Sequence, residues 1–182
     1  KNRIVSVPTI DMNVLRPLHT CFYDHLSRFD WLLRGDAKPV RFKNFSAVQG
    51  EIFVSGDYES ATDNLNTQVQ EFILREVLGQ ARSIPVGVQD TALASLRMSL
   101  ESKGKIVNQA RGQLMGNLLS FPLLCLVNYL AFKFFVPRAV PIRINGDDIV
   151  FRSTPAEAKR WMDGVGRAGL TLSLGKTMTS NR

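Results

Sequence analysis

Cysteine and histidine are scarce in this 182-residue chain, with two residues of each. Cys21 and Cys125 lie far apart without a CxxC pair, so a structural zinc site is not expected. Two separated cysteines also favour a reducing compartment over a disulfide-stapled secreted protein. The sequence has no internal repeat, no low-complexity linker, no signal-peptide pattern and no initiator methionine. We therefore expect the chain to be a piece of a larger protein.

Long hydrophobic runs are rare too, and a single segment suggests a membrane span. LLSFPLLCLVNYLAFKFFV, residues 118–136, contains one charged residue. Ser120 and Pro122 suit the start of a helix and Pro137 ends the run, which leaves a helix roughly 22 Å long. Because a bilayer core is about 30 Å thick, we predict a buried core helix and no membrane span.

Acidic residues are outnumbered by basic ones, 16 to 23, which gives a net charge of +7 and a pI near 9.8. This balance suits a polyanionic partner, such as RNA or a nucleoside triphosphate, or an anionic membrane surface. Apolar residues make up 45% of the chain, as in ordinary soluble proteins. The length allows one good hydrophobic core.

Strand and helix patterns alternate along the chain, and Lys103-Gly104 predicts a hairpin turn. Strands are expected at 4–7, 51–57, 170–176 and in a hairpin at 140–151, and helices at 12–33, 62–78, 84–102, 121–135 and 154–169. These patterns predict a mixed sheet of the α/β type that is covered by helices on one side.

The segment PIRINGDDIVFRS, residues 141–153, predicts a β-hairpin with two adjacent carboxylates at its tip. Asn145-Gly146 is a strong hairpin signal, because both residues accept positive φ angles. The turn projects Asp147 and Asp148, although neighbouring like charges repel. A solvated surface turn and a divalent-cation site are both consistent with this pattern.

A second acidic segment, SGDYESATD at 55–63, supports the cation site. Asp57 ends a strand, where open α/β sheets usually bind ligands. Together with the hairpin it would supply the oxygen ligands that Mg²⁺ prefers. Two ions there would activate a 3′-hydroxyl and stabilise a leaving pyrophosphate. For Asp63 two interpretations stay open, a capping box with Ser60 and a contact to substrate.

Several motifs occur in a specific order: DYESATD, GQLMGNLLSFP, INGDD and GLTLSLGKT. They resemble motifs A, B, C and D of viral RNA-dependent RNA polymerases, and KNRIVSVPT at the start resembles the end of motif F. The resemblance spans essentially the whole chain and is greatest to the ourmia-like (botourmiavirus) polymerases of the narnavirus and levivirus lineage. It implies an α+β polymerase palm at 51–182, which is an RRM-like antiparallel sheet with helices on one face. It also implies a remnant of the fingers with motif F at 1–50, and no thumb.

The resemblance further implies roles for individual residues. Asp57, Asp147 and Asp148 match the metal-binding aspartates, for two Mg²⁺ or Mn²⁺ ions, and Lys176 matches the lysine that protonates the leaving pyrophosphate. Six residues match positions that bind the nucleoside triphosphate: Lys1, Arg3, Asp63, Gly116, Asn117 and Ser120.

The chain departs from the family pattern in motif B. Many such polymerases carry Asn four residues after the hydroxyl residue, where this chain has Leu124. Asn117 and Asn128 are therefore the candidates for the missing contact to ribose.

The function implied is template-directed RNA synthesis during viral genome replication, in the host cytoplasm rather than in the mitochondrion. Template and nascent RNA would be the partners, with phosphates held in part by the basic residues Arg28, Arg34, Lys38, Arg41 and Lys43.

Two alternatives stay open. A reverse transcriptase palm would use an aromatic residue such as Tyr58 as a gate against ribose, although the NGDD turn and Asp63 favour ribose. The other alternative is a catalytically inert, basic RNA-binding fragment.

Overall fold

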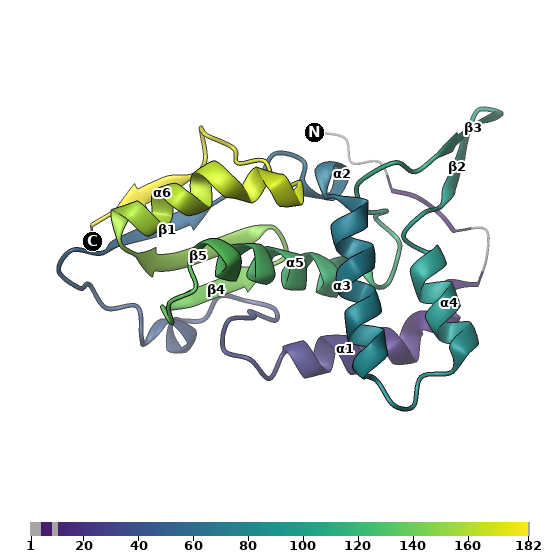
Figure 1. Cartoon of the computed structure of the whole chain (residues 1–182), viewed down its shortest axis with the longest axis horizontal. Coiled ribbons are helices and arrows are strands. Elements are labelled where there is room, and N and C mark those ends of the chain that lie inside the picture. Colours follow the sequence, from purple (N-terminus) through teal and green to yellow (C-terminus); the bar gives the residue numbers. More distant parts are fainter. Residues whose placement is uncertain (1–4, 9–10, 182) are drawn as a thin grey trace.

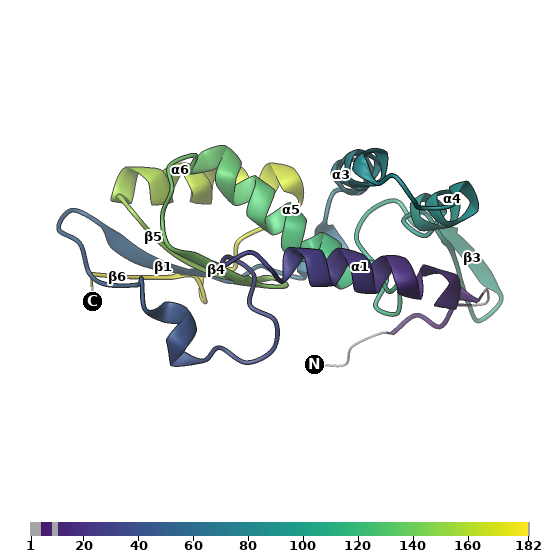
Figure 2. The ribbon, with the colours of Figure 1, turned by 90° about the horizontal axis from the view of Figure 1, so that it is seen from below.

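A four-stranded antiparallel sheet in the order β4-β5-β1-β6 forms one half of the protein, in a computed structural model that describes residues 5–8 and 11–181. Its strands are β1 (Ile52–Gly56), β4 (Ile142–Asn145), β5 (Asp148–Ser153) and β6 (Met178–Ser180). Helices α5 (Ser120–Phe135) and α6 (Pro155–Gly164) cover one face of the sheet, as Figure 2 shows. This arrangement confirms the predicted α+β fold with helices on one face.

The core of this half lies between the sheet and the two helices. Phe132, Phe151 and Trp161 are fully buried, and the Phe151 ring lies 4.7 Å from Phe132 and 5.0 Å from Trp161. Burial of such large apolar side chains is the main favourable term in folding. The prediction of a buried helix near 121–135 is confirmed by α5. Within the described residues, no helix has the length and apolarity that a bilayer crossing requires.

The other half of the protein is mostly helical (Figure 1). It contains η1 (Met12–Leu15), α1 (Arg16–Leu26), α2 (Ala61–Asn64), α3 (Thr67–Gln80), α4 (Val86–Ala94) and the hairpin of β2 (Ser99–Ser102) and β3 (Lys105–Asn108). The Trp31 ring stacks on Tyr129 of α5 at 4.2 Å. Backbone hydrogen bonds link Leu33 and Trp31 to Ile144 of β4. These contacts join the two halves.

Residues 34–50, with η2 (Pro39–Phe42), continue from this helical half. Buried Arg143 donates hydrogen bonds to the Arg41 carbonyl and to Asn44. The Phe45 ring stacks on Phe53 of β1. The segment is therefore fastened to the sheet by side chains that come from the strands.

Several sequence predictions were wrong at the level of element boundaries. Residues 5–7, expected in a strand, form none, although Ser6 donates its backbone N–H to Met115. The single helix expected at 62–78 is two helices, because Asn66 caps α3 by accepting hydrogen bonds from Gln68 and Val69.

Two further segments differ from the prediction. The helix expected at 84–102 ends at Ala94, and Ser99–Ser102 at its far end form β2, which pairs with β3 around the predicted Lys103-Gly104 turn. The strand expected at 170–176 is reduced to one bridge between Leu172 and Tyr58, and the true strand is β6. The predicted helix at 154–169 holds as α6 followed by η3 (Val165–Ala168).

Candidate active site

The pairing of β1 with β5 brings two acidic segments to the same end of the sheet. Strand β1 ends at Gly56, which lies opposite Ile149 of β5, so Asp57 and Asp148 follow at the next position of the register. Asp57 and Asp147 are ninety positions apart in the sequence. This end of the sheet faces the helical half of the molecule (Figure 1).

The hairpin turn that carries the aspartates has Gly146 and Asp147 at its centre. Asn145 pairs with Asp148 and is the last residue of β4. Among these residues only Gly146 has a positive φ, +65°. The prediction that Asn145 also takes a positive φ is therefore wrong, and the glycine alone meets the requirement of a type II′ turn. A Cβ at Gly146 would come within 3.0 Å of the Phe121 ring.

The three carboxylates create a site of excess negative charge. Asp147 and Asp148 are exposed, and Lys176 Nζ lies 3.1 Å from Asp57 Oδ2. Partial burial raises the pKa of Asp148, the charges of Asp147 and Asp57 raise it further, and Lys176 opposes them. One ammonium group therefore faces three acids, and the site favours additional positive charge.

Backbone contacts hold Lys176 next to Asp57. Ser173 donates its backbone N–H to the Asp57 carbonyl at 2.8 Å, and both Lys176 and Thr177 donate theirs to the Ser173 carbonyl at 3.0 and 2.8 Å. The Thr177 hydroxyl also lies 3.4 Å from the Asp57 carbonyl. This tight turn brings the lysine to the aspartate although its side chain is mostly exposed.

The donor set suits a hard divalent cation. Within the part of the chain that the structure describes, no group of three or more His, Cys, Asp or Glu side chains lies in a ready coordination geometry. Mg²⁺, however, keeps several waters and commonly takes only one or two carboxylates together with substrate phosphates. Two exposed aspartates and one half-buried one, with surplus negative charge, fit Mg²⁺ or Mn²⁺ in that partly hydrated form.

The residues predicted to bind nucleotide do not all lie in the part of the chain that the structure describes. Lys1 and Arg3 lie outside the described residues. Asp63 is exposed on α2, and its carboxylate forms no hydrogen bond or ion pair with the described residues. The capping-box interpretation is wrong, because Ser60 adopts a left-handed conformation, φ +47°, and its side chain caps nothing.

Gly116 and Asn117 lie in the loop that enters α5, and Ser120 is the first residue of that helix. Gly116 has φ +138°, and a Cβ there would lie 2.5 Å from the Ser6 carbonyl oxygen. The Asn117 amide donates to Ser95 and accepts from the Leu119 backbone. The Ser120 hydroxyl donates to the Leu114 carbonyl at 3.1 Å. The loop is thus shaped by its own polar groups and by the amino-terminal segment.

Helix α5 contributes two residues to the site whose contacts the sequence did not indicate. Asn128, considered above for ribose, is fully buried and donates to the Gly146 carbonyl at 3.1 Å. Its Oδ1 accepts a hydrogen bond from the Tyr58 hydroxyl at 2.7 Å. Cys125 accepts one from the Gly146 N–H at 3.2 Å. For Asn128 the sequence offered one signal, a polar residue within an otherwise apolar helix. For Cys125 the sequence offered no signal of a role in the site.

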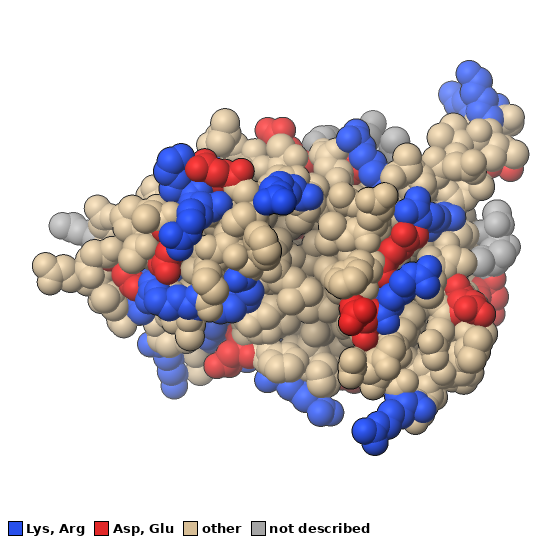
Figure 3. Space-filling model, in the orientation of Figure 1, with Lys and Arg blue, Asp and Glu red and all other residues tan. Residues whose placement is uncertain are grey.

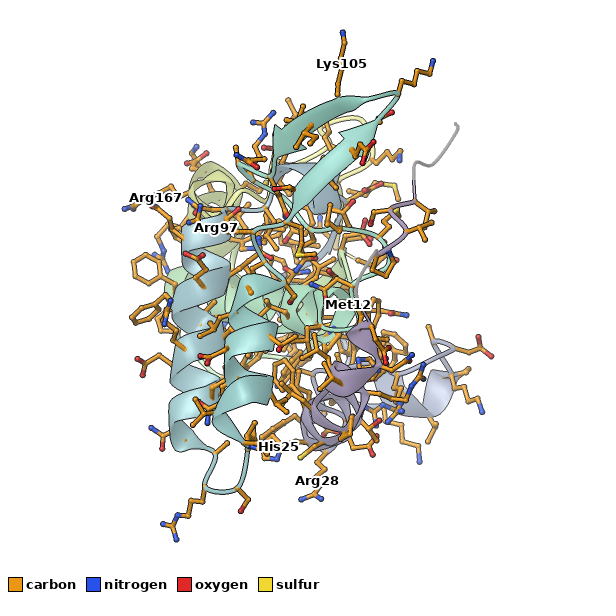
Figure 4. All side chains as sticks on the ribbon, turned by 90° about the vertical axis from the view of Figure 1, so that its right-hand side faces the viewer. Met12, His25, Arg28, Arg97, Lys105 and Arg167 are labelled. Atoms are coloured by element: carbon orange, nitrogen blue, oxygen red, sulfur yellow. The ribbon has the colours of Figure 1, made fainter. Side chains whose placement is uncertain are left out.

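The basic residues predicted to contact RNA divide into two groups. Arg34 pairs with Asp24, and Arg41 donates to the carbonyls of Asp30 and Leu32. The side chain of Arg28 points away from the protein (Figure 4). Figure 3 shows Lys and Arg spread over one face with acidic residues among them. Part of the predicted RNA-contacting set therefore stabilises the segment that carries it.

A recess of about 690 Å³ adjoins the loop before α5. It lies between residues 5–8, strand β2 and Gly116-Asn117. The β2–β3 hairpin that forms one wall ends near Lys105, which projects from the protein in Figure 4.

Comparison with solved structures supports the fold. The polymerase of a human picorbirnavirus, solved as an insertion-loop deletion mutant, matches with a TM-score of 0.75 at 17% identity, over 100% of this chain and 39% of that one. The BmCPV RNA-dependent RNA polymerase at elongation state matches with a TM-score of 0.72 at 14% identity, over 100% of this chain and 19% of that one.

Comparison of sequences gives the relationship. The RNA-dependent RNA polymerase of Ourmia melon virus (isolate Melon/Iran/VE9) is 32% identical over 167 residues, covering 79% of this chain and 19% of the relative. The chain thus spans about a fifth of that relative's length. The family model for mitovirus RNA-dependent RNA polymerase matches residues 1–182. The resemblance noted from the motifs is confirmed over the whole chain, and the protein belongs to the mitovirus RNA-dependent RNA polymerase family.

Proposed function

We propose that this chain is the palm, with part of the fingers, of an enzyme that synthesises RNA on an RNA template. The whole enzyme transfers nucleoside monophosphate to an RNA 3′-hydroxyl and releases pyrophosphate, the reaction that replicates a viral RNA genome. The observation that carries this proposal is the pairing of β1 with β5, which sets Asp57 alongside the Asp147-Asp148 turn. Membership of the family supports the same chemistry.

Asp57, Asp147 and Asp148 are the residues that would hold two Mg²⁺ or Mn²⁺ ions. Such ions, when bound, lower the pKa of the attacking hydroxyl and stabilise charge on the pyrophosphate. The chain itself contributes position and charge, which dominate catalysis of phosphoryl transfer. Lys176, held beside Asp57 by the 173–177 turn, supplies a proton to the leaving oxygen.

For the nucleoside triphosphate we propose Asp63 and Ser120 as the contacts to ribose. The exposed carboxylate of Asp63, which has no partner in the described residues, supports this role. Gly116 and Asn117 shape the loop that presents Ser120. Lys1 and Arg3 are assigned to the triphosphate from the family resemblance alone.

We infer a division into partial fingers at 1–50 and palm at 51–182. All four strands of the larger sheet lie in the second range, which supports this boundary. Template RNA would pass through the recess between residues 5–8, β2 and the loop at Gly116, with RNA phosphates near the exposed lysines and arginines. Replication in the host cytoplasm, rather than in the mitochondrion, stays a prediction.

The position of Tyr58 favours RNA synthesis over reverse transcription. An aromatic gate against ribose has to face the sugar. Tyr58 is 4% exposed and its hydroxyl is bonded to Asn128, so its ring belongs to the core. Comparing the incorporation of ribonucleotides and deoxyribonucleotides by the full-length polymerase tests this choice, and preference for deoxyribonucleotides would contradict it.

The decisive experiment replaces Asp147 by alanine in the full-length polymerase. We expect template-directed nucleotide addition to be abolished, because a metal ligand is lost. Asp163→Ala is the matched control, since this exposed aspartate pairs with Lys159 on α6 and with no other of the described residues. Near-normal addition by Asp147→Ala would reject the role. RNA binding that salt abolishes and Mg²⁺ does not affect, without any nucleotide addition by the wild type, would favour the inert RNA-binding alternative.

A further inference from the structure

Gly146, the first central residue of the catalytic turn, is held by hydrogen bonds with side chains of helix α5. In a two-residue hairpin turn the peptide groups of the central residues lie outside the strand ladder, so they need water or other partners. Here Gly146 is buried, and both of its peptide groups have partners on α5. Its N–H donates to Cys125 Sγ and its carbonyl accepts from Asn128 Nδ2. Buried backbone groups need such partners, so α5 determines where the turn can lie.

Asn128 connects this turn to the neighbouring strand end. Its amide has Nδ2 directed to Gly146 and Oδ1 directed to the hydroxyl of Tyr58. Tyr58 directly follows Asp57 and pairs with Leu172, so it is held on the backbone side as well. A path of hydrogen bonds thus runs from Tyr58 to Gly146. Asp57 is the residue before Tyr58, and Asp147 is the residue after Gly146.

The donor and acceptor pattern of this path requires an amide at position 128. One end must accept from a phenol hydroxyl and the other must donate to a carbonyl, and a short amide side chain does both. An aspartate would place an acceptor against the Gly146 carbonyl, and a leucine would bond to neither partner. Asn128 is fully buried in an otherwise apolar stretch, where an unneeded polar group is costly. Fully satisfied buried networks specify one arrangement of the elements that they join.

The negative charge of Asp147 in the turn affects the titratable groups of this network. Burial raises the pKa of Tyr58, and the nearby charge of Asp147 raises it further. Burial also raises the pKa of the Cys125 thiol to about 12, so this group stays neutral beneath the turn. The network therefore adds no charge of its own to the acidic site above it.

We propose that Tyr58, Asn128 and Cys125 are positioning residues that fix the separation of Asp57 and Asp147. The inference rests on the proposed function, since it concerns how that site is kept in its productive geometry. None of the three touches substrate. They act through the backbone of Gly146 and through the residue next to Asp57.

Loss of these positioning contacts should affect two quantities, the affinity for the metal ion and the rate of the chemical step. A turn released from α5 leaves Asp147 free to move relative to Asp57, and displacements of about 1 Å in a catalytic group cost up to about 100-fold in rate. Binding of the nucleotide base and ribose involves other residues. We therefore expect a lower kcat and a higher half-activating Mg²⁺ concentration, with the KM for nucleotide nearly unchanged.

The test uses the full-length polymerase with Tyr58→Phe, Asn128→Leu and the combined variant. Nucleotide addition is measured against nucleotide and Mg²⁺ concentrations, and thermal unfolding is recorded in parallel. We expect about a tenfold loss of kcat for Tyr58→Phe and about a 100-fold loss for Asn128→Leu. The combined variant should be no slower than Asn128→Leu alone, because the hydroxyl acts only through Asn128.

Controls separate positioning from general stability. Tyr129→Phe removes a phenol hydroxyl from the same helix and should leave kcat and Mg²⁺ dependence unchanged. Cys125→Ser keeps an acceptor for Gly146 and should retain more activity than Cys125→Val. If Asn128→Leu does not fold, the comparison of these two cysteine variants tests the inference. Independent, multiplicative losses in the combined variant, or losses in nucleotide KM alone, would overturn the inference. An inactive wild type would instead refute the proposed function.

Discussion

The two ends of strand β1 adjoin charge clusters of different kinds. In the cluster at the beginning of the strand the acidic and basic side chains neutralise one another, whereas in the cluster at its end they do not. At the beginning, Glu51 accepts hydrogen bonds from Arg138 and Arg152, and Arg138 also binds Glu157 through two nitrogens. Both glutamate side chains are nearly buried. The hydrogen bonds from Arg138 lower the pKa of Glu157 to about 2.

At the end of the same strand, three aspartates share one lysine. The carboxylates there are more exposed, and the pKa of Asp148 is raised instead of lowered. Since two arginines match two glutamates at one end while one lysine faces three acids at the other, the first cluster is complete without a ligand. The comparison teaches that charge balance and burial distinguish a cluster that is neutral by itself from one that, under the proposed function, would bind a cation.

Replacing Asp57 by asparagine should give the largest effect and the sharpest contrast. We expect nucleotide addition by the full-length polymerase to fall by about a thousandfold or more, since the proposed function assigns this carboxylate to a metal ion. Unfolding temperature should stay close to that of the wild type, because the Lys176–Asp57 pair, whose lysine is mostly exposed, contributes little stability. Thermal unfolding and primer extension measure the two quantities. A large loss of stability would mean that this cluster also serves folding.

Replacing Lys176 by methionine should give an intermediate effect. We expect about a 100-fold slower chemical step, in the range of general acid catalysis, and partial recovery with Lys176→Arg, which keeps the charge but donates a proton poorly. Single-turnover kinetics measure the step. Lys159→Met, another exposed lysine paired with an aspartate, is the control. Full recovery with arginine would assign Lys176 to charge neutralisation alone.

Replacing Glu157 by glutamine should affect stability and leave the activity of folded enzyme intact. We expect a loss of about 2 kcal/mol in the free energy of unfolding, because Arg138 loses a charged hydrogen-bond partner. Denaturant unfolding measures this loss, and hydrogen exchange of the β1 and α6 amides shows where it acts. Asp163→Asn, on the same helix but exposed, should change stability little.

The pH dependence of this difference refines the prediction. The folded-state pKa of Glu157, about 2, lies below the ordinary value of 4.5. Its contribution to stability is therefore complete above about pH 5 and declines as pH falls toward 2. The difference between wild type and Glu157→Gln should shrink over that window. A difference that grows as pH falls would contradict the assigned ion pair.

Local patterns gave much of the fold and the identity of the candidate site. Apolar runs and turn residues located β1, α5, α6 and both hairpins, because these signals act over a few residues. They failed where a local preference competes with a distant contact. Residues 99–102 were expected to continue a helix but form β2, since β3 provides a pairing partner.

The acidic residues of the site were recognisable in the sequence, but their support was not. Asp57 and the Asp147-Asp148 pair stand out as carboxylates at a strand end and at a turn. Asn128 lacked any mark of its true contacts, because its partners Tyr58 and Gly146 are 70 and 18 positions away. Asp63 read equally well as a helix cap, and only the left-handed backbone of Ser60 removed that interpretation.

What the sequence alone determined is the set of parts: the chemistry of the aspartates, the glycine that the turn needs, and the order of motifs that marks the family. What only the tertiary structure decided is which parts meet. The pairing of β1 between β5 and β6 sets Asp57 beside the hairpin, and the packing of α5 under Gly146 fixes the turn. The reason is physical: periodicity and turn preference are local, whereas strand pairing and burial depend on chain segments far apart in sequence.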